Sequence, residues 1–173
     1  NDILIPALDS AGKLFEQGKI FLPQLIQTAS VAQAAFEVIK TTLIERNAAP
    51  VSRGEIVLAT VKGDIHDIGK NIVRVLLENY GYTVLDLGRD VPCQLVADTA
   101  KEHGVKLVGL SALMTTTLGA MEETIQLVKQ SCPDCKIVVG GAVLTADYAE
   151  KIGADFYAKD AMETVAVAKE VVG

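Results

Sequence analysis

The first fifty residues carry the hydrophobic pattern of two helices. One set of apolar residues recurs every three or four positions and predicts an amphipathic helix that ends near Gly18: Ile3, Leu4, Leu8, Ala11 and Phe15. Pro23 suits the first turn of a second helix, whose apolar side comprises Leu22, Leu25, Ile26, Ala29, Phe36, Ile39 and Leu43. Two helices cannot bury both stripes alone, so we expect them to pack on another part of the protein. Residues 46–54 have the polar, helix-breaking character of a linker.

From Glu55 onward the pattern changes to short apolar runs, each followed by a helical stretch. The runs lack polar alternation, which is typical of parallel strands covered on both faces; they lie at 56–59, 84–85, 107–110, 137–139 and 156–157. This alternation predicts an α/β fold with a five-stranded parallel sheet, flavodoxin-like (Rossmann-like), in the strand order 2-1-3-4-5. We therefore expect a helical cap and linker at residues 1–50 and an α/β domain at residues 51–173.

Composition narrows the class of protein. Half of the 173 residues are hydrophobic and 22% are charged, which is typical of a soluble globular protein. The net charge of -6 and the lack of any basic run disfavour nucleic acid as a partner. No apolar stretch is long enough to cross a membrane, and the start, Asn1-Asp2, lacks the basic region of a signal peptide. Three cysteines form no even-numbered disulfide framework, so we expect a cytoplasmic protein, with Cys132 and Cys135 in an ordinary surface loop.

The turns that follow the first, third and fourth strands should meet at one crevice, because ligands of such sheets bind beyond the carboxyl ends of the strands. These turns lie at residues 61–71, 111–117 and 140–142, and none carries a phosphate-binding glycine fingerprint or a GxSxG nucleophile elbow. The first turn instead places His66 between Asp64 and Asp67. An imidazole can give one nitrogen to a metal while the other donates to a carboxylate. One His and one Asp cannot hold a bare zinc ion, whereas a metal in a macrocycle needs a single axial ligand.

A known motif covers this turn. The run Asp64-Ile65-His66-Asp67-Ile68-Gly69 is the DxHxxG of cobalamin-binding proteins, and the match extends to Ser111 with the threonines after it and to Gly140-Gly141. The chain resembles, over essentially its whole length, the cobalamin-binding region of cobalamin-dependent methionine synthase. It is more distantly similar to the free-standing corrinoid proteins of methanol and methylamine methyltransferases.

The resemblance implies a role for each matched residue. His66 would be the lower ligand of the cobalt in cobalamin, Asp64 would hold the far nitrogen of its ring, and Thr117, where the family often has Ser, would hydrogen-bond Asp64. This relay could couple proton uptake to the state of the cobalt. Further cofactor contacts in the motif turn would come from Gly63, Ile65, Asp67 and Gly69. The crevice for the nucleotide tail would be lined by Ser111, Thr115, Gly140, Gly141 and Ala161. The upper face of the corrin would be shielded by Phe15 and Leu22.

The implied function is that of a methyl carrier within a methyltransferase, without turnover of its own. Our main interpretation is methionine synthase, which moves a methyl group from methyltetrahydrofolate to homocysteine; the alternative is a free-standing corrinoid protein of a methanol or methylamine system. Partners would be the methyl-donor and methyl-acceptor methyltransferase domains or subunits, together with a reactivation system. A mutase domain usually lacks a helical cap, a cobalamin-sensing regulator needs a DNA-binding segment, and a plain flavodoxin-like domain leaves the DxHxxG turn unexplained.

Simpler structural interpretations remain open for several residues. Asp67 can be a helix N-cap, and His103 with Gly104 has the pattern of a helix C-terminus. Phe15 and Leu22 suit core packing as well as a shield. The resemblance also implies that the cap is a truncated four-helix bundle. Its missing helices would leave an apolar surface exposed or covered by another chain, at Leu4, Leu8, Leu25 and Ile39.

Overall fold

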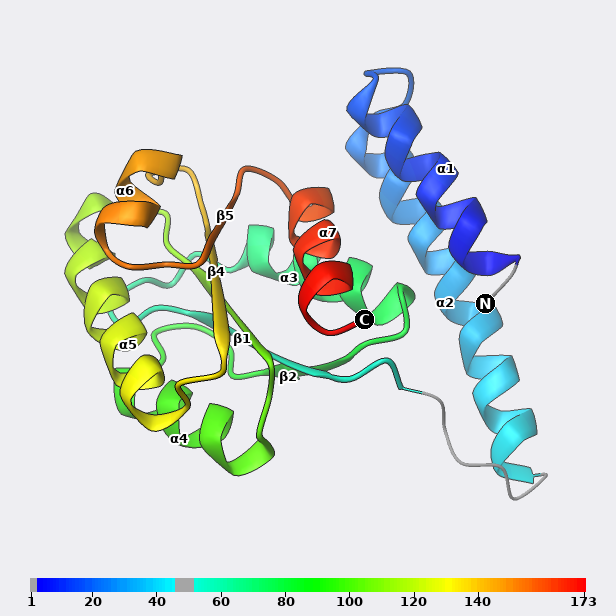
Figure 1. Ribbon diagram of the computed structural model, residues 1–173. Coiled ribbons are helices and arrows are strands. Elements are labelled where there is room, and N and C mark those ends of the chain that lie inside the picture. Colours follow the sequence, from blue (N-terminus) through cyan, green and yellow to red (C-terminus); the bar gives the residue numbers. More distant parts are fainter. Residues whose placement is uncertain (1–2, 46–51) are drawn as a thin grey trace.

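A parallel five-stranded sheet forms the centre of the larger part of the molecule (Figure 1). The computed structural model describes residues 3–45 and 52–173. The strands run in the order β2-β1-β3-β4-β5, which confirms the predicted order and parallel direction. Their bounds are β1 (Glu55–Thr60), β2 (Thr83–Asp86), β3 (Leu107–Ser111), β4 (Lys136–Gly140) and β5 (Phe156–Ala158).

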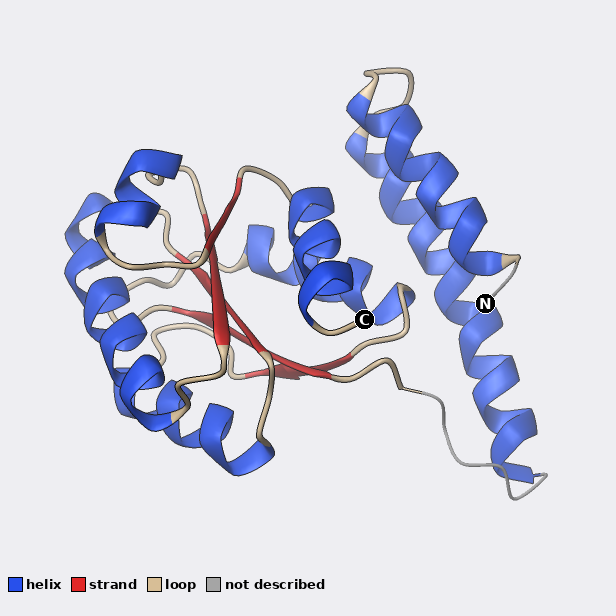
Figure 2. Cartoon of the chain, in the orientation of Figure 1, coloured by secondary structure: helices blue, strands red, loops and turns tan. Residues whose placement is uncertain are grey.

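Helices cover both faces of the sheet, which explains why the strands lack polar alternation (Figures 1 and 2). On β1, Val57 and Ala59 face one core, while Ile56 and Leu58 face the other. The first core is closed by α4 (Cys93–His103), α5 (Leu118–Ser131) and α6 (Ala146–Lys151). The second is closed by α3 (Ile68–Asn79) and α7 (Ala161–Val171). All five helices flank the sheet and leave its carboxyl edge to loops.

The N-terminal part is a pair of helices, α1 (Leu4–Glu16) and α2 (Leu22–Glu45), that lies against α3 and α7 (Figure 1). Leu8 and Leu25 are almost fully buried there, in the same core as Tyr80 and Met162. The expected exposure of Leu8 and Leu25 is therefore wrong, because the α/β part of the same chain covers them. Leu4 is half-buried. The side chain of Ile39 and residues 46–51 of the expected linker lie outside the described part.

Apolar side chains do remain exposed on this helical pair, at other positions than predicted: Ile3, Leu14, Phe21, Leu22, Val31 and Val38. An ion pair adds to the apolar contact with α7, since the Asp9 carboxylate contacts the Lys169 ammonium. In the described residues, no helix combines the length and the apolar character that crossing a bilayer requires.

Three local predictions can be compared with the structure. Helix α4 ends at His103, and Gly104 follows in the left-handed conformation (φ 59°), as predicted for a helix C-terminus. Asp67 occupies the N-cap position of α3, but its side chain makes no capping hydrogen bond. Cys132 is half-buried, whereas Cys135 is buried in the core, so the surface-loop prediction is wrong for Cys135.

Candidate functional site

A cavity of about 800 Å³ lies at the carboxyl edge of the sheet. The loops after all five strands contribute to its wall, and the facing ends of α1 and α2 close one side. The crevice predicted from the strand order is therefore present. Ten of the residues proposed from the sequence line it: Phe15, Leu22, Ile65, His66, Asp67, Gly69, Ser111, Gly140, Gly141 and Ala161.

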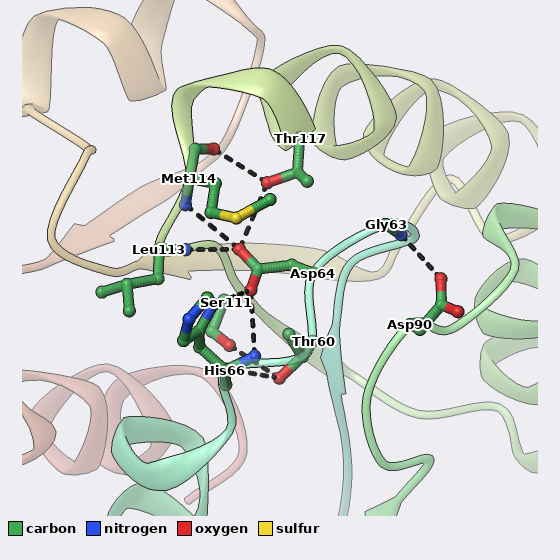
Figure 3. Close-up of polar contacts among 9 residues, drawn as sticks. All are labelled: Thr60, Gly63, Asp64, His66, Asp90, Ser111, Leu113, Met114 and Thr117. Carbon is green, nitrogen blue, oxygen red and sulfur yellow. Dashed lines mark hydrogen bonds and ion pairs between the residues drawn. The ribbon is translucent and has the colours of Figure 1, made fainter.

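Asp64 holds the turn after β1 together from a fully buried position (Figure 3). Its Oδ1 accepts a hydrogen bond from the backbone N–H of His66 (3.0 Å) and lies 2.8 Å from Nδ1 of the same residue. Its Oδ2 accepts from the backbone N–H of Leu113 (2.7 Å) and of Met114 (3.1 Å), and from the Thr117 hydroxyl (3.2 Å). The pairs Asp64–His66 and Asp64–Thr117 predicted from the motif are thus both formed.

Hydrogen-bond donors stabilise the negative charge of the buried Asp64 carboxylate. Burial alone would raise the pKa of this carboxyl group, but the backbone N–H groups of His66, Leu113 and Met114 and the His66 side chain lower it from 3.8 to about 2. The group is therefore ionised at neutral pH, and its Oδ1 lies within hydrogen-bond distance of Nδ1 of His66. This contact selects the tautomer in which Nε2 carries the free lone pair.

The imidazole of His66 remains accessible at the cavity, because its side chain is 45% exposed. Among the described residues Nε2 has no hydrogen-bond partner, while Nδ1 is engaged by Asp64. The described part of the chain contains no group of three or more His, Cys, Asp or Glu residues that could hold a metal ion. The site therefore offers a metal one nitrogen, which suits a centre whose other ligands come from a macrocycle.

The three cavity-lining glycines predicted from the motif, Gly69, Gly140 and Gly141, serve different purposes. A Cβ atom on Gly141, whose φ is 134°, would lie 1.9 Å from the carbonyl oxygen of Ala112, so this glycine lets the loops after β3 and β4 meet. A Cβ on Gly140 would lie 3.0 Å from the carbonyl oxygen of Ala158. A Cβ on Gly69 would meet no protein atom within 4 Å, although Gly69 lines the cavity. The open space beside Gly69 is available to a ligand.

Two predicted cofactor contacts do not reach the cavity wall. Thr115 is exposed at the start of a short 3-10 helix (Thr115–Thr117), and Gly63 lies in the turn before Asp64, outside the lining. Thr117 is buried behind Asp64 and acts on the site through that carboxylate. Phe15 packs against the second core and also lines the cavity, whereas Leu22 lines the cavity and is exposed.

Several residues around the site lie outside the motif and were missed by motif reasoning. Asp90, after β2, accepts a hydrogen bond from the backbone of Gly63, and the Thr60 hydroxyl lies 3.0 Å from that of Ser111. Lys70 lines the cavity, yet its ammonium is buried against the Asp86 carboxylate. The strand order was the signal that could have found Asp90 and Asp86, since β2 lies beside β1.

Comparisons with known proteins identify the family to which this geometry belongs. Residues 54–166 match a family model described as B12 binding domain, and residues 1–40 match a second family model of the same description. The chain belongs to the B12-binding domain family. It therefore binds a cobalamin-type corrinoid, as the sequence predicted.

Relatives support this assignment across nearly the whole chain. Dimethylamine corrinoid protein 1 of Methanosarcina acetivorans is 44% identical over 98% of this chain and 80% of its own length. A cobalamin-binding protein of Desulfitobacterium hafniense has a similar structure (TM-score 0.82, 36% identity, 96% of this chain and 78% of that chain). So does the methanol:cobalamin methyltransferase complex of Methanosarcina barkeri (TM-score 0.84, 31% identity, 99% of this chain and 65% of that chain).

These comparisons change the balance between the two functions inferred from the sequence. They support the resemblance to cobalamin-binding proteins but not methionine synthase in particular, which was our main interpretation. The alternative, a corrinoid protein of a methanol or methylamine system, agrees better with the similarity to a dimethylamine corrinoid protein.

Proposed function

We propose that this chain is the corrinoid methyl carrier of a methylamine methyltransferase system. The observation that carries the proposal is the single free imidazole nitrogen of His66 in a cavity of about 800 Å³, in a chain 44% identical to a dimethylamine corrinoid protein. A bound corrinoid supplies a cobalt centre that accepts a methyl group and gives it up again. The carrier itself would hold and present that centre to the enzymes of the system.

In this proposal Nε2 of His66 would hold the cobalt of the corrinoid. Asp64 would keep the ring in the tautomer that offers Nε2, through the Nδ1 contact. Thr117 and the two backbone N–H groups after β3 hold Asp64 in place. Because the backbone N–H groups and the His66 side chain lower the pKa of Asp64 to about 2, this carboxylate stays ionised beside the imidazole.

Other residues would seat the rest of the cofactor. The open space beside Gly69 and the small residues Ser111, Gly140 and Ala161 line the part of the cavity that suits the nucleotide tail. The apolar side chains Ile65 and Leu113 line the cavity too and are partly exposed. A corrin ring seated there would cover these side chains and exclude water from the His66 ligand.

The remaining parts of the proposal concern organisation and partners. Residues 1–50 would form a helical cap with its linker, and residues 51–173 the corrinoid-binding domain. A methyl-donor methyltransferase would load the carrier, an acceptor methyltransferase would unload it, and a reactivation system would restore oxidised cobalt.

Transfer assays test which donor the carrier serves. The reduced, cobalamin-loaded chain is mixed with dimethylamine and a dimethylamine methyltransferase, and methylation is followed by absorbance. We expect methylation in this mixture and none with methyltetrahydrofolate and a methionine synthase donor domain. The similarity to the methanol methyltransferase complex makes methanol with its methyltransferase the second candidate. If methyltetrahydrofolate methylated the bound cobalamin while dimethylamine and methanol did not, the proposal would be contradicted.

A further inference from the structure

Asp90 occupies an unusual backbone position beside the DxHxxG turn. Its φ is 51°, and it is the single non-glycine residue with a positive φ in the part of the chain that the structure describes. It lies between β2 and α4, and the side chain is exposed rather than packed in the core. An L-residue in this region costs free energy, and glycine would adopt the conformation more easily. Asp is among the few L-residues that adopt this region, because its short polar side chain can hydrogen-bond locally.

What the side chain provides is a hydrogen-bond acceptor for the turn (Figure 3). The Asp90 Oδ1 atom accepts the backbone N–H of Gly63 at 2.7 Å. The backbone N–H of Asp90 donates to the carbonyl oxygen of Asp64 at 2.9 Å. One residue thus holds two consecutive residues of the turn, one through its side chain and one through its backbone.

Among the described residues, Asp90 alone connects the Gly63-Asp64 backbone by hydrogen bonds to another loop. The N–H of Asp64 donates to the carbonyl oxygen of Val61 at 3.0 Å and closes the turn, with Gly63 at a φ of 85° in the middle. Without Asp90 the N–H of Gly63 would be left to water. The Thr60 hydroxyl donates to the carbonyl oxygen of His66 at 3.4 Å.

A shift of the Gly63-Asp64 backbone would change the orientation of the His66 imidazole. The Asp64 carboxylate orients the imidazole of His66 through a 2.8 Å contact. The backbone of the same residue, Asp64, is hydrogen-bonded by Asp90. We propose that Asp90 is a positioning residue, which fixes the Gly63-Asp64 backbone so that Nε2 of His66 meets the cobalt of a bound corrinoid. This inference rests on the proposed role of His66 and adds the residue that sets its geometry.

Two variants of Asp90 separate the contribution of the acceptor from that of the backbone. Asp90→Gly keeps the left-handed conformation without strain but removes the acceptor oxygen. Asp90→Asn keeps an acceptor oxygen and also tolerates the left-handed region. Urea unfolding of both apo variants checks that each remains folded, which the exposed position of Asp90 favours.

The first readout needs no cofactor. In the apo protein, hydrogen exchange of the Gly63 amide and the nitrogen-15 shifts of the His66 ring report the turn and the tautomer. We expect faster exchange and a less uniform tautomer in Asp90→Gly, with Asp90→Asn close to the parent. If Asp90→Gly showed the same Gly63 amide exchange rate and the same His66 ring shifts as the parent, the inference would be overturned.

The second readout is the rate at which cobalamin dissociates. Loss of a group that orients a metal ligand typically weakens metal binding about 10–100-fold, so we expect dissociation from Asp90→Gly to be about 10-fold faster than from the parent and from Asp90→Asn. Equal rates in Asp90→Gly and the parent would contradict the inference, as would equal defects in both variants. If the parent itself bound no cobalamin, the proposed function would fail, and the apo measurements would still decide whether Asp90 orients His66.

Discussion

At the scale of single residues, the site depends on how many donors converge on one carboxylate. Asp64 has no exposed surface, and each of its two oxygens accepts from its own set of donors. The motif predicted the partnership of Asp64 with His66 and Thr117. It could not reveal the backbone donors of Leu113 and Met114, because a backbone N–H leaves no trace in the sequence.

Replacing Asp64 by Asn should therefore destabilise the apo protein. In either orientation the new NH₂ group faces N–H donors, so buried donors lose their acceptor, which costs about 2–3 kcal/mol of unfolding free energy at pH 7. Asp67→Asn is the matched control, since the Asp67 side chain makes no capping hydrogen bond, and we expect a change within about 0.5 kcal/mol. Urea unfolding measures both, and equal losses in the two variants would contradict this role of Asp64.

The same carboxylate should give the apo protein a specific acid sensitivity. The pKa of Asp64 is about 2 in the folded chain and 3.8 without the fold, so its stabilising contribution is complete above about pH 4 and is lost as the pH falls through about 2. We expect the stability of the parent to fall more steeply than that of Asp64→Asn below pH 4, by up to about 2 kcal/mol. Parallel curves of unfolding free energy against pH would show that Asp64 has no such role.

At the scale of elements, the strands were predictable because burial on both faces leaves uninterrupted apolar runs such as Leu107–Leu110. Which part of the protein covers the apolar side of α1 and α2 could not be predicted from the sequence. The apolar stripe of α1 shows that Leu8 must be buried, but periodicity does not show whether a missing helix or the α/β part covers it. The contribution of Asp90 was hidden for a similar reason, since it depends on the loop after β2 lying against the loop after β1.

The end of α1 offers a test of the shield at the cavity. Phe15 lines the cavity, whereas Leu14 beside it does not and is 39% exposed. We expect Phe15→Ala to speed photolysis of bound methylcobalamin, because a looser cage lets the methyl radical escape, and Leu14→Ala to leave the rate unchanged. Phe15 is only half-buried, so its stability loss should stay below the roughly 3–5 kcal/mol typical of a buried phenylalanine. Equal photolysis rates in Phe15→Ala and the parent would assign Phe15 to core packing alone.

At the scale of the whole molecule, one cavity joins the two parts of the chain. Its floor is the carboxyl edge of the sheet with His66, and its side is the end of the helical pair with Phe15 and Leu22. Each of these residues could be named from the sequence by resemblance to a family. The assembly of the cavity follows from the strand order, which places the loops after β1 and β3 side by side.

The identity of the cobalt ligand is tested most directly by electron paramagnetic resonance of the Co(II) state, prepared with nitrogen-15 histidine. The chain has two histidines, and His103 lies with Glu55 at the opposite edge of the sheet from His66. We predict the nitrogen-15 hyperfine doublet in the parent and in His103→Ala, and its loss in His66→Ala. A spectrum that keeps the nitrogen-14 triplet of dimethylbenzimidazole in the labelled parent would contradict ligation by His66.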